Sequence, residues 1–206
     1  PPQRGERRVE VEFDAEPSLA IGFHKPALGH PDDYVFDVID ELLTDGPTSR
    51  LYSKLVRDSR LAASVNSDAN YPGVRSANLF VLSATPLAPH STAEVETAIL
   101  AELERLKTEP VAPKELERIV NNLDADMVRA LRSNSGLASQ LALYQTVAGD
   151  WRFILKSRDR IAAVTPADIQ RVATQYFTKS NRTVATLVKK TASKQVATVT
   201  SDKGAR

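Results

Sequence analysis

The three histidines of the sequence, His24, His30 and His90, are the first residues to consider for chemistry. A helix-borne hydrolytic zinc site needs two His one helical turn apart, so that both reach one ion, with a Glu between them as general base. No two of the three His are four residues apart. The sequence therefore predicts no catalytic residue and no metal ligand, and no zinc hydrolysis by this chain alone.

One cluster of donors could in principle hold a metal ion, namely His30 with Asp32 and Asp33. A loop His ahead of two acids at the start of a helix explains the same residues, because acidic side chains favour the N-terminal end of a helix. Donors bunched in one turn also rarely converge on a tetrahedral site. We therefore favour the helix-start interpretation.

Composition excludes several other kinds of chemistry. There is no Cys, which excludes disulfides, thiolate metal sites and a Cys nucleophile, and suits an oxidising periplasm and a reducing cytoplasm equally well. The sequence has no Gly-x-Ser-x-Gly elbow, phosphate-binding loop or Rossmann fingerprint. Lys and Arg number 27 against 26 Asp and Glu, and they are scattered, so we expect no nucleic-acid partner. No apolar run approaches the roughly 20 residues that span a bilayer.

The alternation of apolar and polar residues predicts five strands. Residues 7–13 alternate charged and apolar side chains, which favours a strand with one buried face. Residues 18–24 are more continuously apolar and suit a central strand. The remaining strands are predicted at 61–70, 76–85 and 183–188.

Apolar residues at helical spacing predict the helices between and after these strands. They are expected at 34–43, 51–56, 95–106 behind a capping box at Ser91–Glu94, 116–131 with a continuation at 137–147, and 169–177. We expect Trp151 to pack a helix onto the core. The order β-β-α-α-β-β-α-α-α-β indicates an α+β fold, with an antiparallel sheet and helices packed on one face.

Three stretches, in this order, resemble the peptidase domain of the M16 family of zinc peptidases, which includes insulinase and mitochondrial processing peptidase. In residues 42–52, Gly46 is followed by Ser49-Arg50-Leu51, and family members commonly place a Gly, a small hydroxyl residue and Arg-Leu between their first two helices. Residues 55–65 are similar to the family segment Leu-Arg-Glu-Lys-Arg-Gly-Leu-Ala-Tyr-Ser-Val. Residues 181–188 are similar to the closing strand of many such domains.

This resemblance implies an M16 domain over residues 7–188, between a linker remnant at 1–6 and a frayed polar tail at 189–206. M16 enzymes pair two similar halves, on one chain or two, around an unfolded peptide. One half binds zinc through His-x-x-Glu-His and a distant Glu. This chain resembles the other half, because the helix at 34–43 contains no His. The implied partners are therefore a zinc-containing catalytic half and an unfolded peptide substrate.

In many members the non-catalytic half contributes an Arg and a Tyr that contact the substrate. Arg57 falls on the Arg position and Ala63 on the Tyr position, with one residue deleted before it. Arg57 and, more weakly, Tyr71 are thus the predicted substrate-binding residues. The alternatives are that Arg57 acts alone, that Tyr71 replaces the missing Tyr, or that the site is degraded. Arg57 also fits a structural role as a cation at a helix C-terminus.

Two other functional classes remain open from the sequence. One is a structural subunit of a larger complex, like the M16-like core subunits of respiratory complexes, which would bind no substrate. The other is a generic α+β interaction domain whose likeness to M16 is coincidental. A helix-covered antiparallel sheet would argue against the second.

Overall fold

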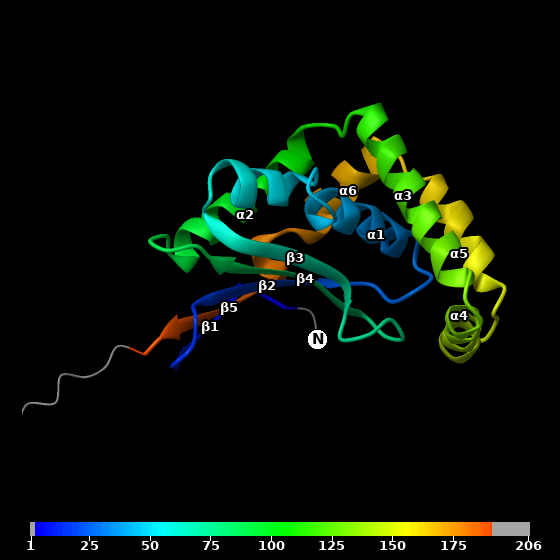
Figure 1. Ribbon diagram of the computed structural model, residues 1–206, viewed down its shortest axis with the longest axis horizontal. Coiled ribbons are helices and arrows are strands. Elements are labelled where there is room, and N and C mark those ends of the chain that lie inside the picture. Colours follow the sequence, from blue (N-terminus) through cyan, green and yellow to red (C-terminus); the bar gives the residue numbers. More distant parts are fainter. Residues whose placement is uncertain (1–2, 191–206) are drawn as a thin grey trace, which may run out of the picture.

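A computed structural model describes residues 3–190 of the chain, so most of the expected tail, residues 191–206, lies outside the described residues. Five strands form one sheet in the order β1-β5-β2-β4-β3 (Figure 1). Their bounds are β1 Arg7–Phe13, β2 Ser18–Lys25, β3 Ala62–Tyr71, β4 Asn78–Pro86 and β5 Arg182–Lys189. These positions confirm the five predicted strands. Neighbouring strands are antiparallel except β1 and β5, which run parallel at one edge.

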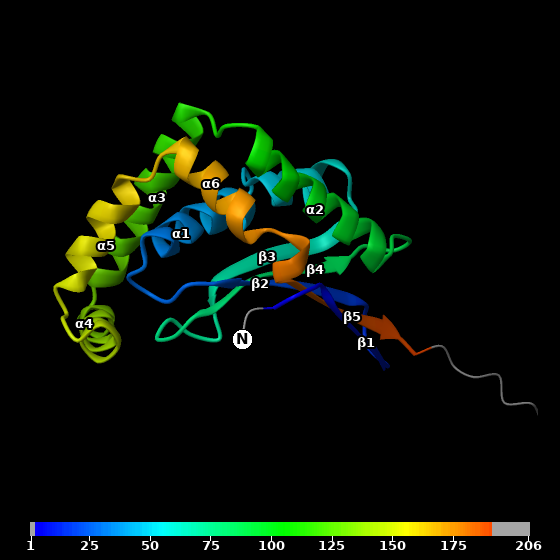
Figure 2. The same cartoon turned by 180° about the vertical axis from the view of Figure 1, so that it is seen from behind.

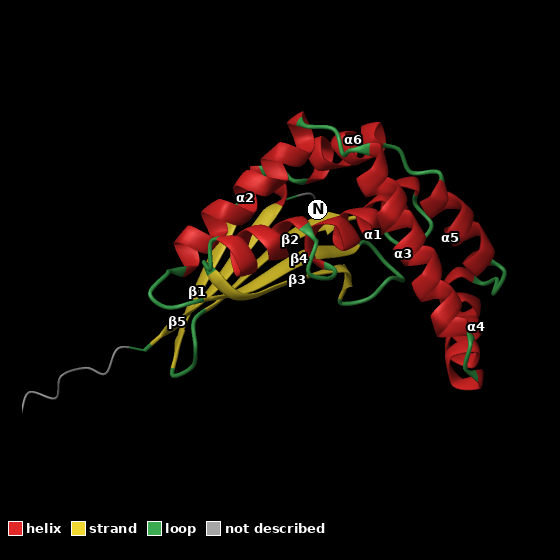
Figure 3. Ribbon diagram, turned by 45° about the horizontal axis from the view of Figure 1, so that its top comes forward, coloured by secondary structure: helices red, strands yellow, loops and turns green. Residues whose placement is uncertain are grey.

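The helices lie on one face of this sheet, as Figures 1 and 2 show from opposite sides. They are α1 Pro31–Thr44, η1 Tyr52–Asp58, α2 Thr92–Thr108, α3 Pro113–Leu131, α4 Asn134–Ala148, α5 Phe153–Ala162, α6 Pro166–Tyr176 and the short η2 Lys179–Asn181. Helices α1, α2 and α6 cover the sheet, whereas α3, α4 and α5 extend beyond its end (Figure 3). The predicted α+β layer architecture is therefore confirmed. In the described residues, no helix is long and apolar enough to cross a bilayer.

Local sequence signals fix where the main helices begin. His30 caps α1 by accepting a hydrogen bond from the Asp32 amide (3.1 Å). Capping boxes begin α2 and α6, each with a hydroxyl residue at the N-cap and an acid three residues later. Ser133 caps α4, so the stretches predicted at 116–131 and 137–147 belong to two separate helices.

The core lies between the sheet and the three helices that cover it. From β2, Leu19, Ile21 and Phe23 point into it and are at most 1% exposed. The ring of Phe36 on α1 lies 5.6 Å from that of Phe80 on β4 and packs edge-on against that of Phe177. Such tilted and edge-to-face contacts are the favoured geometries for buried aromatic rings.

Three expectations are wrong in detail. All seven residues of β1 are exposed, although their alternation predicted a buried face, because no element within residues 3–190 covers either face of this edge strand. Trp151 is 41% exposed, since it sits in the turn between α4 and α5, away from the core. Five α-helices follow β4, where three were expected, because the loss of period near residues 132–152 marks two further helix ends.

Candidate functional site

The resemblance to M16 peptidases implies that helix α1 corresponds to the helix that carries the zinc motif in a catalytic half. The side chains there with i, i+3 and i+4 spacing are Asp37, Asp40 and Glu41, so carboxylates stand at the spacing that a zinc motif gives to His and Glu. Burial is the largest cause that raises the pKa of each group: to about 7 for Asp37, about 6 for Asp40 and about 7 for Glu41. These donors do not fit zinc, which prefers His and thiolate ligands.

Buried partners hold this acidic face of α1 in place. Lys25 of β2 has a fully buried side chain and donates to Asp33 at 2.5 Å and to Asn70 at 3.3 Å. On the other side, Asn122 of α3 donates to Glu41 Oε1 at 3.0 Å. Because each contact joins α1 to a different element, the polar groups of this helix serve packing between elements.

One group of carboxylates in the described residues is close enough to share a cation. Oxygen atoms of Glu41, Asp45 and Asp126 lie within 4.8 Å of one another where α1 ends beside α3. Oxygen ligands of this kind suit a hard cation such as Ca²⁺ rather than zinc. Asp45 and Asp126 are exposed, and their charges add to the effect of burial on the pKa of Glu41.

His30, Asp32 and Asp33, the cluster considered for a metal ion, each bind a different partner. His30 caps α1, Asp33 binds Lys25, and Asp32 accepts from the Tyr176 hydroxyl at 2.8 Å. Arg171 also lies 2.7 Å from Asp32 and, with Tyr176, holds the pKa of that carboxyl below its usual range despite burial. This arrangement matches the helix-start interpretation.

Arg57 lies at the C-terminal end of η1, with more than half of its side chain exposed. Its Nε donates to Asp58 Oδ1 at 2.8 Å, and the Asp58 carboxylate raises the pKa of the guanidinium further above its usual value. The guanidinium keeps N–H groups free for a peptide carbonyl, because it carries five donors. Its position also fits the structural role of a cation at a helix C-terminus.

The two predicted substrate-binding residues lie at opposite ends of β3. Arg57 precedes this strand and Tyr71 ends it, so the ten residues of β3 separate them by roughly 30 Å at about 3.3 Å per residue. Within this chain they do not share a site. Ala63, at the Tyr position of the family segment, is exposed, and substrate contact by Arg57 or Tyr71 stays a prediction.

The backbone before β3 explains a feature of the same segment. Arg60 has a φ of +51°, a left-handed conformation that glycine adopts without strain, and the family segment has Gly at this place.

Sequence reasoning missed the role of Arg50 in the Gly46–Leu51 motif. Arg50 pairs with Glu115 of α3 and approaches Glu102 of α2, whose side chain is only 1% exposed. Lys54 also binds Glu102, at 3.3 Å. The motif thus ties the end of α1 to two later helices. Charge patterning alone could not reveal this, because the partners lie 52 and 65 residues further along the chain.

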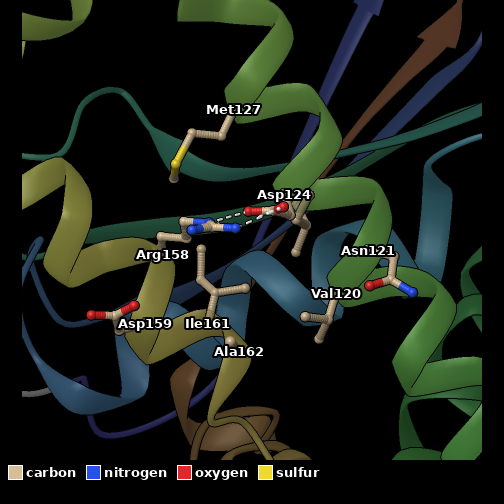
Figure 4. A pocket seen from close by; sticks show the side chains of 9 residues that line it. Val120, Asn121, Asp124, Met127, Arg158, Asp159, Ile161 and Ala162 are labelled. Carbon is tan, nitrogen blue, oxygen red and sulfur yellow. Dashed lines mark hydrogen bonds and ion pairs between the residues drawn. The ribbon is translucent and has the colours of Figure 1, made fainter.

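A cavity of about 330 Å³ lies between α3 and α5 (Figure 4). Its walls include Val120, Met127 and Ile161, and the ion pair between Asp124 and Arg158 crosses one side. The lining holds no His, hydroxyl or thiol side chain. It can accommodate an apolar group, and its polar lining consists of Asn121, Asp124, Arg158 and Asp159.

Comparison with known proteins was made for the sequence and for the fold. The sequence model described as Peptidase M16 inactive domain matches residues 1–123. The zinc protease PqqE of Helicobacter pylori is 30% identical over 185 residues, which are 89% of this chain and 41% of that protein. The chain thus spans about two fifths of the length of this curated relative.

Two solved structures share the fold over most of the chain. A protease from Helicobacter pylori superposes with a TM-score of 0.84 at 29% identity, covering 91% of this chain and 45% of that one. The inactive peptidase domain of a candidate zinc protease from Bordetella parapertussis gives a TM-score of 0.75 at 27% identity. In that case the match covers 91% of this chain and 98% of the other.

Proposed function

The chain belongs to the M16 peptidase family as its inactive domain, and from this premise we propose that it is the non-catalytic half of a zinc metalloendopeptidase. In this proposal it pairs with a catalytic M16 half, on the same or another chain, closes the substrate chamber and helps to bind unfolded peptide. The relatives that support this are named proteases, and the chain spans less than half of each of the two from Helicobacter pylori.

The observation that carries the pairing is the apolar row of β1. Val9, Val11 and Phe13 are 53%, 49% and 62% exposed, although they alternate with charged residues as in a strand with one buried face. Their paired neighbours on β5, Ala185 opposite Val9 and Leu187 opposite Val11, extend this apolar surface. Large contiguous apolar surfaces on soluble proteins mark interaction sites, so a partner that covers this face explains the pattern.

Zinc belongs to the catalytic half in this proposal. The donors on α1 of the present chain are carboxylates, and those at the Glu41 cluster suit a hard cation. We therefore assign no chemical step to this chain. Its contribution is to exclude water from the chamber and to hold the peptide, which is a recognised source of catalytic power.

Arg57 is the proposed peptide contact. Among residues 3–190, its exposed guanidinium binds its neighbour Asp58 and the Pro47 carbonyl at 3.4 Å, and both are exposed residues. Because exposed ion pairs contribute little to stability, exchanging them for a peptide carbonyl costs little. Tyr71, at the far end of β3, would contact a different part of an extended peptide.

The experiment that tests this function measures cleavage of an unstructured fluorogenic peptide by a separately produced catalytic half. Adding the present chain should raise a chelator-sensitive rate, while the chain alone should show none. No change in rate on addition would contradict the proposal. A scaffold that binds no substrate is the alternative, and the protease names of the matching relatives do not favour it.

A further inference from the structure

Helix α3 carries an apolar stripe that the described chain covers only in part. The members of the stripe stand at intervals of four, three and four residues, and they are Leu116, Val120, Leu123 and Met127. This is the spacing at which one helix packs along another. Leu116 is buried, whereas the other three are only partly buried. Within residues 3–190, the stripe therefore extends beyond the core.

A groove follows this stripe. Its two parts are the cavity of about 330 Å³ beside the C-terminal part of α3 (Figure 4) and a second cavity of about 370 Å³ beside the N-terminal part. Val120, Asn121 and Ala162 line both cavities, so the two adjoin. From Leu116 to Met127 the groove is about 16 Å long, at about 1.5 Å per residue.

The groove is apolar along its floor and open at its centre. Ile161 at the end of α5 and Val164 after it line the wall opposite the stripe. Ala162, where the two cavities meet, is exposed, and its side chain is too small to fill the space. A concave apolar surface about three helical turns long fits the apolar side of another helix, which is a recurring mode of recognition.

The charged residues of the groove favour a cationic partner. Arg158 pairs with Asp124 at 3.1 Å, so these two charges offset each other. The remaining charged residues of the lining are Glu117 on α3 and Asp159 on α5, and both are exposed. Glu117 lies two turns of α3 before Asp124, and Asp159 follows the partner of Asp124. The two unpaired acids of the lining are therefore about 10 Å apart along the groove.

We propose that this groove binds an amphipathic helix of a partner protein. The helix presents apolar side chains at intervals of three and four residues to the groove, and two Lys or Arg residues about two turns apart to Glu117 and Asp159. The groove lies at the opposite end of the molecule from β1, the strand assigned to the catalytic half (Figure 1). The inference therefore does not depend on the proposed peptidase function, which cleavage assays test separately.

Fluorescence anisotropy with two labelled synthetic peptides tests the site on the purified chain. Both peptides are helix-forming sequences of Ala and Gln with Leu at intervals of four, three and four residues. One carries two Lys about two turns apart beside the Leu stripe, and the other carries two Glu at the same positions. The Lys peptide should bind about tenfold more tightly than the Glu peptide, because like charges that face each other across a contact repel.

Substitutions of two neighbouring alanines locate the binding. Ala162→Trp places a bulky side chain where the two cavities meet, so it should weaken binding of the Lys peptide about tenfold. Ala163→Trp is the matched control and should leave binding unchanged, because Ala163 is also exposed but lines neither cavity. Since both positions are exposed, both variants should keep the fold, which circular dichroism checks.

Paired substitution of the two acids tests the role of charge. Glu117→Gln together with Asp159→Asn should remove the preference for the Lys peptide, while the apolar contact remains. Absence of binding of the Lys peptide to the wild-type chain overturns the inference. So does equal binding of the two peptides, binding of the Lys peptide that Ala162→Trp leaves unchanged, or a preference for Lys that survives the paired substitution.

Discussion

Arg50 and Glu115 form a two-pronged ion pair, with Nε–Oε1 at 3.0 Å and Nη2–Oε2 at 2.7 Å. The pair joins the segment after α1 to the first turn of α3. It therefore fixes the orientation of α3, the first of the three helices that extend beyond the sheet. Glu102 of α2 lies 3.7 Å from the same guanidinium and is almost fully buried. A single side chain of the family-like motif thus positions two helices.

Arg50→Ala should destabilise the fold by about 2 kcal/mol, because Glu102 and Glu115 lose a partner while Lys54 and Arg105 still neutralise Glu102. Arg50→Lys should recover only part of this loss, since an ammonium cannot form the two-pronged contact. Urea unfolding of the three proteins provides the measurement. Equal midpoints for wild type and Arg50→Ala would show that the pair is dispensable.

Arg57→Ala should leave the unfolding midpoint unchanged, because the side chain is exposed and its partners in the described structure, Asp58 and Pro47, are exposed as well. In an assembly with a catalytic half, the same variant should lower the rate of peptide cleavage. Arg75→Ala, an exposed arginine in the loop between β3 and β4, is the control and should keep full activity. Unchanged turnover in Arg57→Ala would leave Arg57 only its structural role.

The buried acids of α1 should make stability depend on pH. The pKa values of Asp37 and Glu41 are raised to about 7 in the fold, from ordinary values of 3.8 and 4.5. At pH values between the ordinary pKa and the raised pKa of each acid, the folded state holds a proton that the unfolded state has released. The free energy of unfolding should therefore fall as pH rises from about 5 to 8.

Asp37→Asn and Glu41→Gln should each reduce this fall by the order of 1 kcal/mol. Urea unfolding at about pH 5 and about pH 8 measures this change in the free energy of unfolding. Asp124→Asn is the control, because Arg158 holds the pKa of Asp124 below its usual range and the group stays charged throughout. Stability that rises from pH 5 to 8 in the wild type, with no effect of the two variants, would contradict these assignments.

Phe36→Ala should cost about 3–5 kcal/mol, since the ring is fully buried and touches three other aromatic rings. Thermal unfolding would show the loss as a large drop in midpoint. The comparison is Phe13→Ala on the exposed edge strand, which should change the midpoint little in the monomer.

Local patterns were sufficient to predict much of the fold. The continuous apolar run of β2 marked a central strand, and the Ser91–Glu94 box marked the start of α2 to the residue. The apolar run of β2 reflects burial within the chain itself, and the capping box depends on two residues that are close together in the sequence. The same logic failed for β1, whose alternating pattern predicts a buried face that the described part of the chain leaves exposed.

The candidate site was harder to predict than the fold. The absence of a zinc motif could be seen directly in the spacing of three His. The separation of Arg57 and Tyr71 follows from the length of β3, which the strand predicted at 61–70 already implied. The partners of Arg50 were hidden, since contacts across dozens of residues leave no local signal. Helix α4 was foreseen only as a continuation of α3, because its apolar residues keep a helical spacing.

The metal content of the purified chain tests the non-catalytic assignment most directly. Elemental analysis after dialysis against trace zinc should find none retained, because the one group of three or more candidate ligands in the described residues, Glu41, Asp45 and Asp126, has no His and suits a harder cation. Roughly one zinc per chain would contradict the account. It would then be necessary to look for a catalytic centre within this chain itself.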